Sequence, residues 1–351
     1  MKPQEQFIII GENIHTTRVL LKIGKRYLIE GSEEYVLYSD SAGRDKKLAL
    51  SESAKLGQDY DQGRIKHVKV ALQMAMGVDE TQDAGKSYLN ALINHQVNAG
   101  AHYLDLNVDE ISLERIEQER AMEWLAGFVS SQTELPLAID SSAVSVIKAG
   151  IVGWEAGPGS ANRPLLNSAS LERLDVLDLV ADHGCRVVIT AAGESGMPYD
   201  SNARVANLNK MISHALERGI AKKDLFLDPL VFPIAVDGEY GQHVLDAISE
   251  LRELHGPEIH ITGGFSNVSF GIPERNLINA VFVQLAVDYG ADSGIVDPLS
   301  LVSLQGLDEE DAQESIRLAE DVLLGRDPDC SAYIRAWREK RLRPLPRKSF
   351  S

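Results

Sequence analysis

Polar side chains recur in this sequence at the ends of short apolar runs, which is where parallel α/β sheets place their binding groups. Carboxylates accept paired N–H donors, whereas amides both donate and accept. This combination suits a neutral ring dense in hydrogen-bonding groups, such as an aminopyrimidinone edge. The candidate side chains, in chain order, are those of Glu12, Asn13, Asp105, Asn107, Asp140, Asn167, Asp228 and Asn267.

Motifs of several other chemistries are missing from the sequence. It contains no Walker phosphate loop, no G-x-S-x-G elbow and no H-E-x-x-H pair. The cysteines, Cys185 and Cys330, lie far apart in the chain, so they predict neither a disulfide framework nor a structural zinc site. We therefore expect inert cysteines and no metal centre.

The apolar runs that precede these polar residues alternate with helical patterns, a rhythm typical of repeated βα units. Eight runs read as strands: 7–11, 103–108, 135–140, 164–168, 185–191, 225–230, 258–262 and 293–296. Amphipathic stretches at 113–131, 171–183, 242–255 and 276–289 read as helices, and glycines stand where helices should end, at 184, 219, 256 and 290. The predicted fold is an α/β (β/α)8 TIM barrel, which needs about 250 residues.

The remaining residues fall in two places. Residues 18–65 interrupt the connection after the first strand, and their alternation with glycine breaks predicts a small β-meander. The barrel is then expected over 1–327, followed by a C-terminal extension at 328–351. Its segment 335–348 carries a balance of +6, and we expect this basic tail to pair with the protein's own acidic surface. We expect the meander to contact a partner or a second copy of the chain.

Charge and hydropathy exclude several classes of partner. The 351 residues carry 35 Lys and Arg against 52 Asp and Glu, a net charge of −17 that disfavours nucleic acid and anionic membranes. No apolar run is long enough for a spanning helix, and the four apolar residues before Gly11 are too few for a secretion signal. The sequence predicts a soluble, cytoplasmic protein.

Six segments carry a family resemblance that spans most of the predicted barrel. They are IGENIH at 10–15, LDLNV at 104–108, MEWL at 122–125, LAIDSS at 137–142, FLDPL at 226–230 and GGFSNVSF at 263–270. The last, followed by Arg275 and Asn276, is the most specific. These segments resemble the pterin-binding family, which includes dihydropteroate synthase. Within it they most resemble the methyltetrahydrofolate:corrinoid protein methyltransferases and the folate domain of cobalamin-dependent methionine synthase.

The resemblance implies methyl transfer between N5 of tetrahydrofolate or 5-methyltetrahydrofolate and the cobalt of cobalamin, a corrinoid carried by a partner protein, in a direction the sequence leaves open. It implies a role in one-carbon metabolism and a homodimer. By the same resemblance Asn267 is the catalytic asparagine. The implied pterin and folate site consists of Asp140, Asn167, Asp228, Asp105, Asn107, Gly264, Ser266 and Arg275, with Glu12 and Asn13 as further candidates.

One departure from the family pattern leaves alternatives open. The methyltransferases usually carry Glu-Arg-x-Asn after the first strand, whereas this chain has Glu12-Asn13-Ile14-His15. We expect His15 to cap or pack. The alternative functions are a condensation of the dihydropteroate synthase type, disfavoured by LNVDEIS and SNVSFGI at that enzyme's loop positions, and a non-catalytic subunit that binds folate or a corrinoid protein.

Overall fold

The computed structural model describes residues 7–77, 81–158, 162–194, 196–301, 304 and 310–345. Its main sheet has eight strands in the order β12-β11-β10-β9-β8-β7-β1-β13. In chain order they are β1 (Ile8–His15), β7 (Tyr103–Asn107), β8 (Leu137–Asp140), β9 (Leu165–Ala169), β10 (Arg186–Thr190), β11 (Leu225–Asp228), β12 (His260–Ile261) and β13 (Ser293–Val296). Each of these strands overlaps one of the predicted strands.

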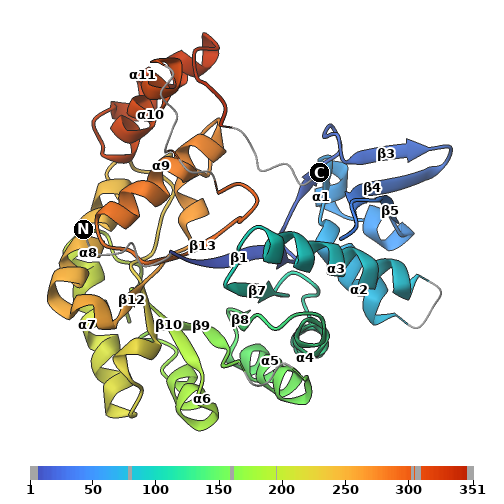
Figure 1. Cartoon of the computed structure of the whole chain (residues 1–351), viewed down its shortest axis with the longest axis horizontal. Helices are drawn as coiled ribbons and strands as arrows, with labels where there is room; N and C mark the ends of the chain where they lie inside the picture. The colour runs from blue at the N-terminus through green and yellow to red at the C-terminus, as the bar shows by residue number, and fades with distance from the viewer. Residues whose placement is uncertain are drawn as a thin grey trace. The chain divides into compact units, whose positions relative to one another are not determined.

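Helices follow the strands as βα repeats require, and Figure 1 shows them arranged outside the strands. Before β7 lie α2 (His67–Met76) and α3 (Gln82–Asn98). The later helices are α4 (Arg115–Gln132), α5 (Val144–Ala156), α6 (Asp175–His183), α7 (Ser201–Glu217), α8 (Tyr240–His255), α9 (Arg275–Asp288), α10 (Glu310–Leu323) and α11 (Ser331–Arg338). Gly184 ends α6 with φ of 64°, the left-handed conformation expected of a glycine cap.

The two edge strands of the sheet, β12 and β13, lie next to each other. A parallel bridge joins Gly264 to Ile295, and the amide of Ile295 donates to the carbonyl of Gly263 at 2.9 Å. This contact closes the parallel sheet into the predicted (β/α)8 TIM barrel.

The described chain forms two compact units. We call residues 11–167 the N-terminal unit, and residues 7–10 with 168–345 the C-terminal unit. Both units contain buried apolar side chains.

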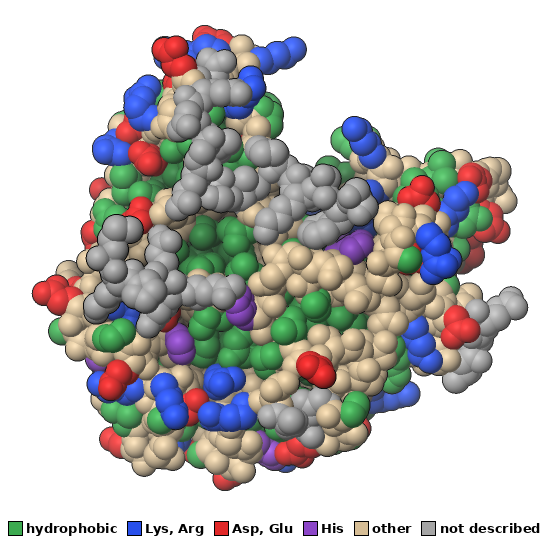
Figure 2. All heavy atoms as spheres, viewed as in Figure 1, with side chains coloured by type: hydrophobic (Ala, Val, Ile, Leu, Met, Phe, Trp, Pro, Cys, Tyr) green, Lys and Arg blue, Asp and Glu red, His purple; other side chains and the backbone are tan. Residues whose placement is uncertain are grey.

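The insertion after β1 belongs to the N-terminal unit. Its centre is an antiparallel sheet of β3 (Tyr27–Glu30), β4 (Glu33–Ser39) and β5 (Asp45–Ala49), which confirms the predicted meander. The rest of residues 18–65 differs from a meander: β2 (Leu20–Leu21) pairs with β6 (Arg64–Ile65), and η1 (Glu52–Lys55) and α1 (Gln58–Asp61) lie between β5 and β6. Acidic and basic side chains lie next to one another over the β3-β4-β5 sheet (Figure 2).

Tyr88 on α3 anchors the meander. Its hydroxyl accepts a hydrogen bond from Arg26 Nη2 at 2.7 Å and also bonds His67 Nδ1 at 2.9 Å. The Tyr38 ring meets the Tyr88 ring edge-on at 4.8 Å, and the Tyr38 hydroxyl bonds Ser87 Oγ at 3.1 Å. Because Tyr88 is fully buried, these bonds satisfy its hydroxyl and fix the meander on α3.

The crossing of α4 and α5 sets how closely the outer helices of the N-terminal unit pack. A Cβ atom at Gly153 would lie 2.1 Å from the carbonyl oxygen of Glu123, a distance that no side chain tolerates. Glycine at this position therefore allows the two helix backbones to touch.

The C-terminal extension begins with η5 (Pro328–Cys330) and α11. Arg341 forms ion pairs with Glu314 on α10 at 2.7 Å and with Glu339 at 2.9 Å, as expected of a basic tail that pairs with its own acidic surface. Residues 346–351, which include Arg347 and Lys348 of that tail, lie outside the described residues. Cys185 and Cys330 are buried free thiols. None of the helices described above is long and apolar enough to cross a bilayer.

Candidate active site

Three predicted polar residues stand in register across neighbouring strands of the N-terminal unit. Asn107 at the end of β7 pairs with Asp140 at the end of β8, and Asp140 pairs with Asn167 on β9. Asn107 Nδ2 donates to Asp140 Oδ2 at 2.8 Å. Within the described chain the side-chain amide of Asn167 has no hydrogen-bond partner, so it is available to a ligand. Parallel strands with matched ends thus align an amide, a carboxylate and a second amide.

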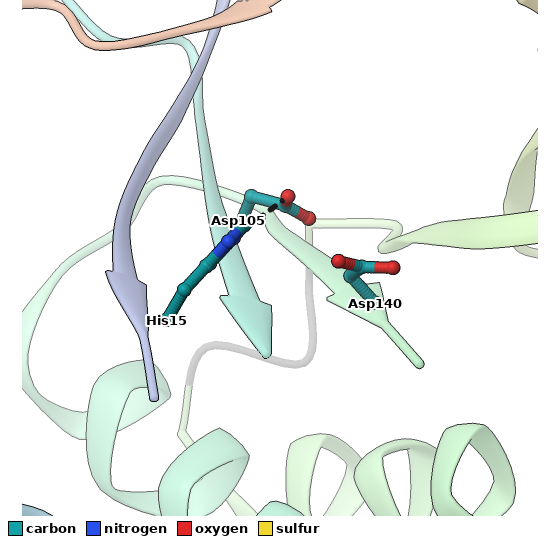
Figure 3. Close-up of side chains that lie close together, drawn as sticks. All are labelled: His15, Asp105 and Asp140. Atoms are coloured by element: carbon teal, nitrogen blue, oxygen red, sulfur yellow. Dashed lines mark hydrogen bonds and ion pairs between the residues drawn. The ribbon is translucent and has the colours of Figure 1, made fainter. Parts of the chain in front are cut away.

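His15 and Asp105 form a pair beside these residues (Figure 3). His15 Nε2 lies 3.0 Å from Asp105 Oδ2, and the two side chains are 15% and 1% exposed. Asp105 Oδ1 is buried without a hydrogen-bond partner in the described chain. Figure 3 shows the side chains of His15, Asp105 and Asp140 approaching one another from β1, β7 and β8. A buried carboxylate with one unpaired oxygen is unusual, and such a group makes this place a candidate functional site.

Burial and charge shift the proton affinity of this cluster. Burial and, after it, the neighbouring Asp105 charge raise the pKa of Asp140, whereas His15 and the Asn107 hydrogen bond lower it, and the result is a pKa of about 7. Burial also works against charge on His15, but the hydrogen bond and charge of Asp105, with the charges of Asp140 and Glu12, raise its pKa overall. Its acidic neighbours therefore favour the charged form of His15, beside a carboxyl group whose pKa is near neutral.

Asp109 supports the end of β8 through hydrogen bonds to the following loop. Its Oδ1 accepts from Ser141 Oγ at 2.5 Å and its Oδ2 accepts from the Ser142 amide at 2.9 Å. The Asp109 amide donates to Asn107 Oδ1 at 3.0 Å. These bonds hold Asn107 with its Nδ2 toward Asp140, so Asp109 is a positioning residue.

Glu12 and Asn13 lie within β1, because this strand continues to His15 and does not stop at residue 11 as predicted. Arg18 donates to both of them, to Asn13 Oδ1 at 2.6 Å and to Glu12 Oε1 at 3.3 Å. The backbone amide of Asn13 donates to Gln96 Oε1 at 3.0 Å. An arginine thus bonds Glu12, but it is Arg18 and not a residue at the arginine position of the family pattern.

Asp228 is the predicted ring acceptor of the C-terminal unit. It ends β11, and its Oδ1 accepts from the Leu230 amide at 2.8 Å, in a turn where Leu230 has φ of 65°. Burial raises the pKa of Asp228 more than the Leu230 amide and the charge of Arg204 lower it, and the result is a pKa of about 6. Arg204 is itself buried, with Nη2 lacking a hydrogen-bond partner in the described chain.

Asn267 lies in the short 3-10 segment η4 (Phe265–Ser269) of the C-terminal unit. Its backbone is fixed at both sides, since its amide donates to the Gly264 carbonyl at 3.0 Å and its carbonyl accepts from the Phe270 amide at 3.2 Å. Its side chain is exposed and has no hydrogen-bond partner among the described residues. A Cβ atom at Gly264 would lie 2.8 Å from Asn267 Nδ2, so glycine makes room for this amide.

Arg275, the first residue of α9, supports the same loop. Its Nε donates to Ser269 Oγ at 3.0 Å, its Nη2 donates to the Ser266 carbonyl at 2.9 Å, and its guanidinium stacks 4.2 Å from the Phe270 ring. Ser266 therefore contributes its backbone carbonyl to this bracing. The arginine braces the loop that presents Asn267.

The predicted residues thus form two local sets. The N-terminal unit brings together Asp105, Asn107, Asp140 and Asn167, with Glu12 and Asn13 joined by Arg18. The C-terminal unit holds Asp228 on β11 and places Gly264, Ser266, Asn267 and Arg275 in one loop.

Sequence reasoning missed His15, Arg18 and Asp109 as parts of the site. His15 was expected to cap or pack. Side chains of a strand alternate between its two faces, so His15 lies on the same face as Asn13, and the alternation would have found it had the strand been extended to residue 15. Arg18 had no such signal, because it stood at the start of an insertion.

The arrangement offers acceptors for N–H donors, a group for proton exchange, and three side chains that could hold a metal ion. Donor atoms of His15, Asp105 and Asp140 lie within 4.8 Å of one another. The hydrogen bonds from His15 to Asp105 and from Asn107 to Asp140 already explain their orientation without an ion.

Comparison with known proteins places the chain in a family. The family model described as "Pterin binding enzyme" matches residues 80–297. The methylcorrinoid:tetrahydrofolate methyltransferase of Eubacterium limosum is 31% identical over 261 residues, which cover 72% of this chain and 88% of that protein. The methionine synthase of Mycobacterium leprae is 30% identical over 235 residues, but the match covers 64% of this chain and only 19% of that protein.

Among solved structures, dihydropteroate synthase from Stenotrophomonas maltophilia with bound imidazole aligns with a TM-score of 0.49 at 20% identity, over 74% of this chain and 89% of that one. The Yersinia pestis dihydropteroate synthase in complex with a pterin-sulfa conjugate aligns with a TM-score of 0.47 at 18% identity, over 74% and 89%. The sequence match to the family model covers more than half of the chain, and the polar ends of β7, β8, β9 and β11 lie within it. The chain belongs to the pterin binding enzyme family.

Proposed function

We propose that this protein transfers a methyl group between N5 of tetrahydrofolate and the cobalt of a corrinoid carried by a partner protein. The observation that carries the proposal is the 31% identity across 88% of a relative named methylcorrinoid:tetrahydrofolate methyltransferase. The methionine synthases match 64% of this chain, although the match spans only about a fifth of their length.

In this proposal the aligned polar groups recognise the pterin ring. Asp140 and Asp228 accept N–H groups of the aminopyrimidinone, while Asn167 offers an amide that both donates and accepts. Asp105 and Asn107 act through their contacts with His15 and Asp140. Glu12 and Asn13 lie near the end of β1, a few residues before His15.

Asn267 is the proposed catalytic residue. A methyl group on a tertiary amine is a poor electrophile, because its departure would leave an amide anion, so N5 must gain positive character in the transition state. The Asn267 amide can stabilise that charge by a hydrogen bond but cannot supply the proton itself. Its exposed side chain on a braced backbone suits this task, since little reorganisation is needed. The corrinoid supplies or accepts the methyl group.

The test mixes the purified protein with 5-methyltetrahydrofolate and Co(I) cobalamin and follows the cobalt absorbance. We expect methylcobalamin to form, and the rate to fall by about 100-fold or more in Asn267→Ala, the size seen when a transition-state hydrogen bond is removed. Asp140→Ala should weaken the reaction, chiefly by weakening folate binding. Asn202→Ala, an exposed asparagine on α7, is the matched control and should react as the wild type does.

Two other outcomes would contradict the proposal. Condensation of a dihydropterin pyrophosphate with p-aminobenzoate would assign the chain to the dihydropteroate synthase reaction. Folate binding without methyl transfer in either direction, even with an authentic methylated corrinoid protein, would make it a non-catalytic binding subunit.

A further inference from the structure

The recognition chemistry proposed above uses the His15–Asp105 contact but gives His15 itself no role. Asp105 is 1% exposed, one of its oxygens bonds His15, and the other is buried without a partner in the described chain. Burying such a group is costly unless nearby charge compensates for it. The buried Asp105 carboxylate therefore needs a positive charge close by, and the His15 imidazole beside it is a group that can carry one.

Acidic groups on three strands act on the charge of this imidazole. They are Glu12 on β1 itself, Asp105 on β7 and Asp140 on β8, and Asp109 beyond β7 adds its charge to the environment of Asp140. Within this cluster His15 is the group that can become cationic. The Arg18 guanidinium nearby is engaged with Glu12 and with Asn13.

We propose that His15 is a positioning residue for Asp140: its imidazolium, held by Asp105, offsets the Asp105 charge, so that Asp140 can ionise and accept the N–H groups of a pterin ring. This inference rests on the proposed function for the identity of the ligand. It assigns a role to a residue that departs from the family pattern.

The charges in the cluster determine how Asp140 responds. Asp105 raises the pKa of Asp140 and His15 lowers it, so two neighbours act in opposite directions on one carboxyl group. A carboxyl with a pKa of about 7 is only partly ionised at neutral pH. Because ligand N–H donors favour the ionised form, binding should release a proton from Asp140 to the buffer.

Because Asp105 and His15 shift the pKa of Asp140 in opposite directions, replacing each of them should move that pKa in opposite directions. His15→Gln removes the cation and leaves the Asp105 charge, so the Asp140 transition should move to higher pH, by about 1 unit or more. Asp105→Asn removes the larger effect together with the reason for His15 to be charged, so the transition should move to lower pH. A purely structural role predicts no such pair of opposite shifts.

The experiment is a pH titration of the ligand-free protein by infrared spectroscopy of protonated carboxylic acids. The Asp140 band is assigned as the one absent in Asp140→Asn. We expect its midpoint near pH 7 in the wild type, higher in His15→Gln and lower in Asp105→Asn. His214→Gln on α7, where the imidazole lies beside Glu217 outside this cluster, is the matched control and should leave the midpoint unchanged.

Calorimetry of tetrahydrofolate binding at pH 7 in buffers of different ionisation enthalpy gives the second readout. Proton release should fall in Asp105→Asn, where Asp140 is already ionised, and rise in His15→Gln, where it starts fully protonated. An Asp140 midpoint that neither variant moves, or that both move the same way, would overturn the inference. So would a stoichiometric divalent cation that the wild type binds and both variants lose. Opposite infrared shifts without any folate binding would instead contradict the proposed function alone.

Discussion

Asp228 shows how one buried side chain can make stability depend on pH. Its pKa in the folded protein is about 6, against an ordinary value of 3.8, because it is buried at the end of β11. A carboxyl group with a raised pKa binds protons more tightly in the folded than in the unfolded chain. The folded state therefore loses stability as pH rises through the window between those two values, from about 4 to about 6.

We predict that Asp228→Asn removes this dependence. The free energy of unfolding of the variant, relative to the wild type, should increase by roughly 2 to 3 kcal/mol between pH 4 and pH 6, because a shift of one pKa unit corresponds to about 1.4 kcal/mol. Urea titrations of both proteins at several pH values measure the difference. A difference that is constant across this window would contradict the raised pKa. Asp237→Asn, on an exposed carboxylate after the same strand, serves as the control.

Some residues of the candidate site could be predicted from the sequence, whereas the contacts between them could not. Asp140 and Asn167 were predicted because each ends an apolar run, and the structure places them in register on adjacent strands. The His15–Asp105 hydrogen bond could not be predicted, since it joins residues 90 positions apart and depends on where β1 ends. The raised pKa of Asp140 likewise depends on burial and on neighbours that only the folded chain assembles.

At the scale of elements, α4 and α5 cross at a point that only glycine permits. We predict that Gly153→Ala destabilises the protein by about 1 to 3 kcal/mol, since a Cβ atom 2.1 Å from the Glu123 carbonyl must push the helices apart. Chemical denaturation measures the change. Gly238→Ala, where no atom lies within 4 Å of the new Cβ, is the matched control and should change stability by less than about 0.5 kcal/mol. Equal effects of the two substitutions would contradict the close crossing.

The elements themselves were largely predictable. Strands β7 to β13 and helices α4, α8 and α9 fall within a few residues of their predicted bounds, because apolar runs and helical periodicity are local properties of the sequence. The start of α6 differs: the predicted helix began at residue 171, whereas residues 170–174 form turns and the helix begins at Asp175. Hydrophobic periodicity continues through such turns and does not reveal them.

At the scale of the whole molecule, the insertion after β1 is the main addition to the barrel. It exposes large apolar side chains, including Ile23 at 93% and Ile29 at 59%, which suits a surface for another protein. We therefore keep the prediction that the meander contacts a partner, with the corrinoid protein as the partner the proposed function supplies.

Replacing residues 27–49 by a short glycine-serine linker should raise the KM for the corrinoid protein by about 10-fold, as expected when contacts worth about 1.4 kcal/mol are lost. Tetrahydrofolate binding and the reaction with free cobalamin should stay unchanged, because neither needs the meander. Steady-state kinetics with both methyl carriers test this. Ile29→Asp keeps the sheet intact and should show a smaller change in the same direction. Unchanged kinetics with the corrinoid protein in both variants would contradict the prediction.

The domain division remains a prediction as well: a barrel over 1–327, interrupted at 18–65, with an extension at 328–351. Composition could locate the extra residues, because the barrel repeats account for the others. It could not show that α11 contacts the segment just before α9, where the Tyr333 hydroxyl donates to the Pro273 carbonyl at 3.2 Å. A single sequence gives no indication that two residues so far apart in the chain are in contact.

The short pair of β2 with β6 has a consequence for how this protein can change. Leu20 pairs with Ile65, and the Lys22 amide donates to the Gly63 carbonyl at 2.8 Å, so the chain leaves and re-enters the barrel at adjacent points. The segment between those points is joined to the barrel by this short stem and by its contacts with Tyr88 on α3. Segments of other lengths can replace it without altering the spacing of β1 and α2, which makes this position a natural attachment point for exchangeable recognition modules.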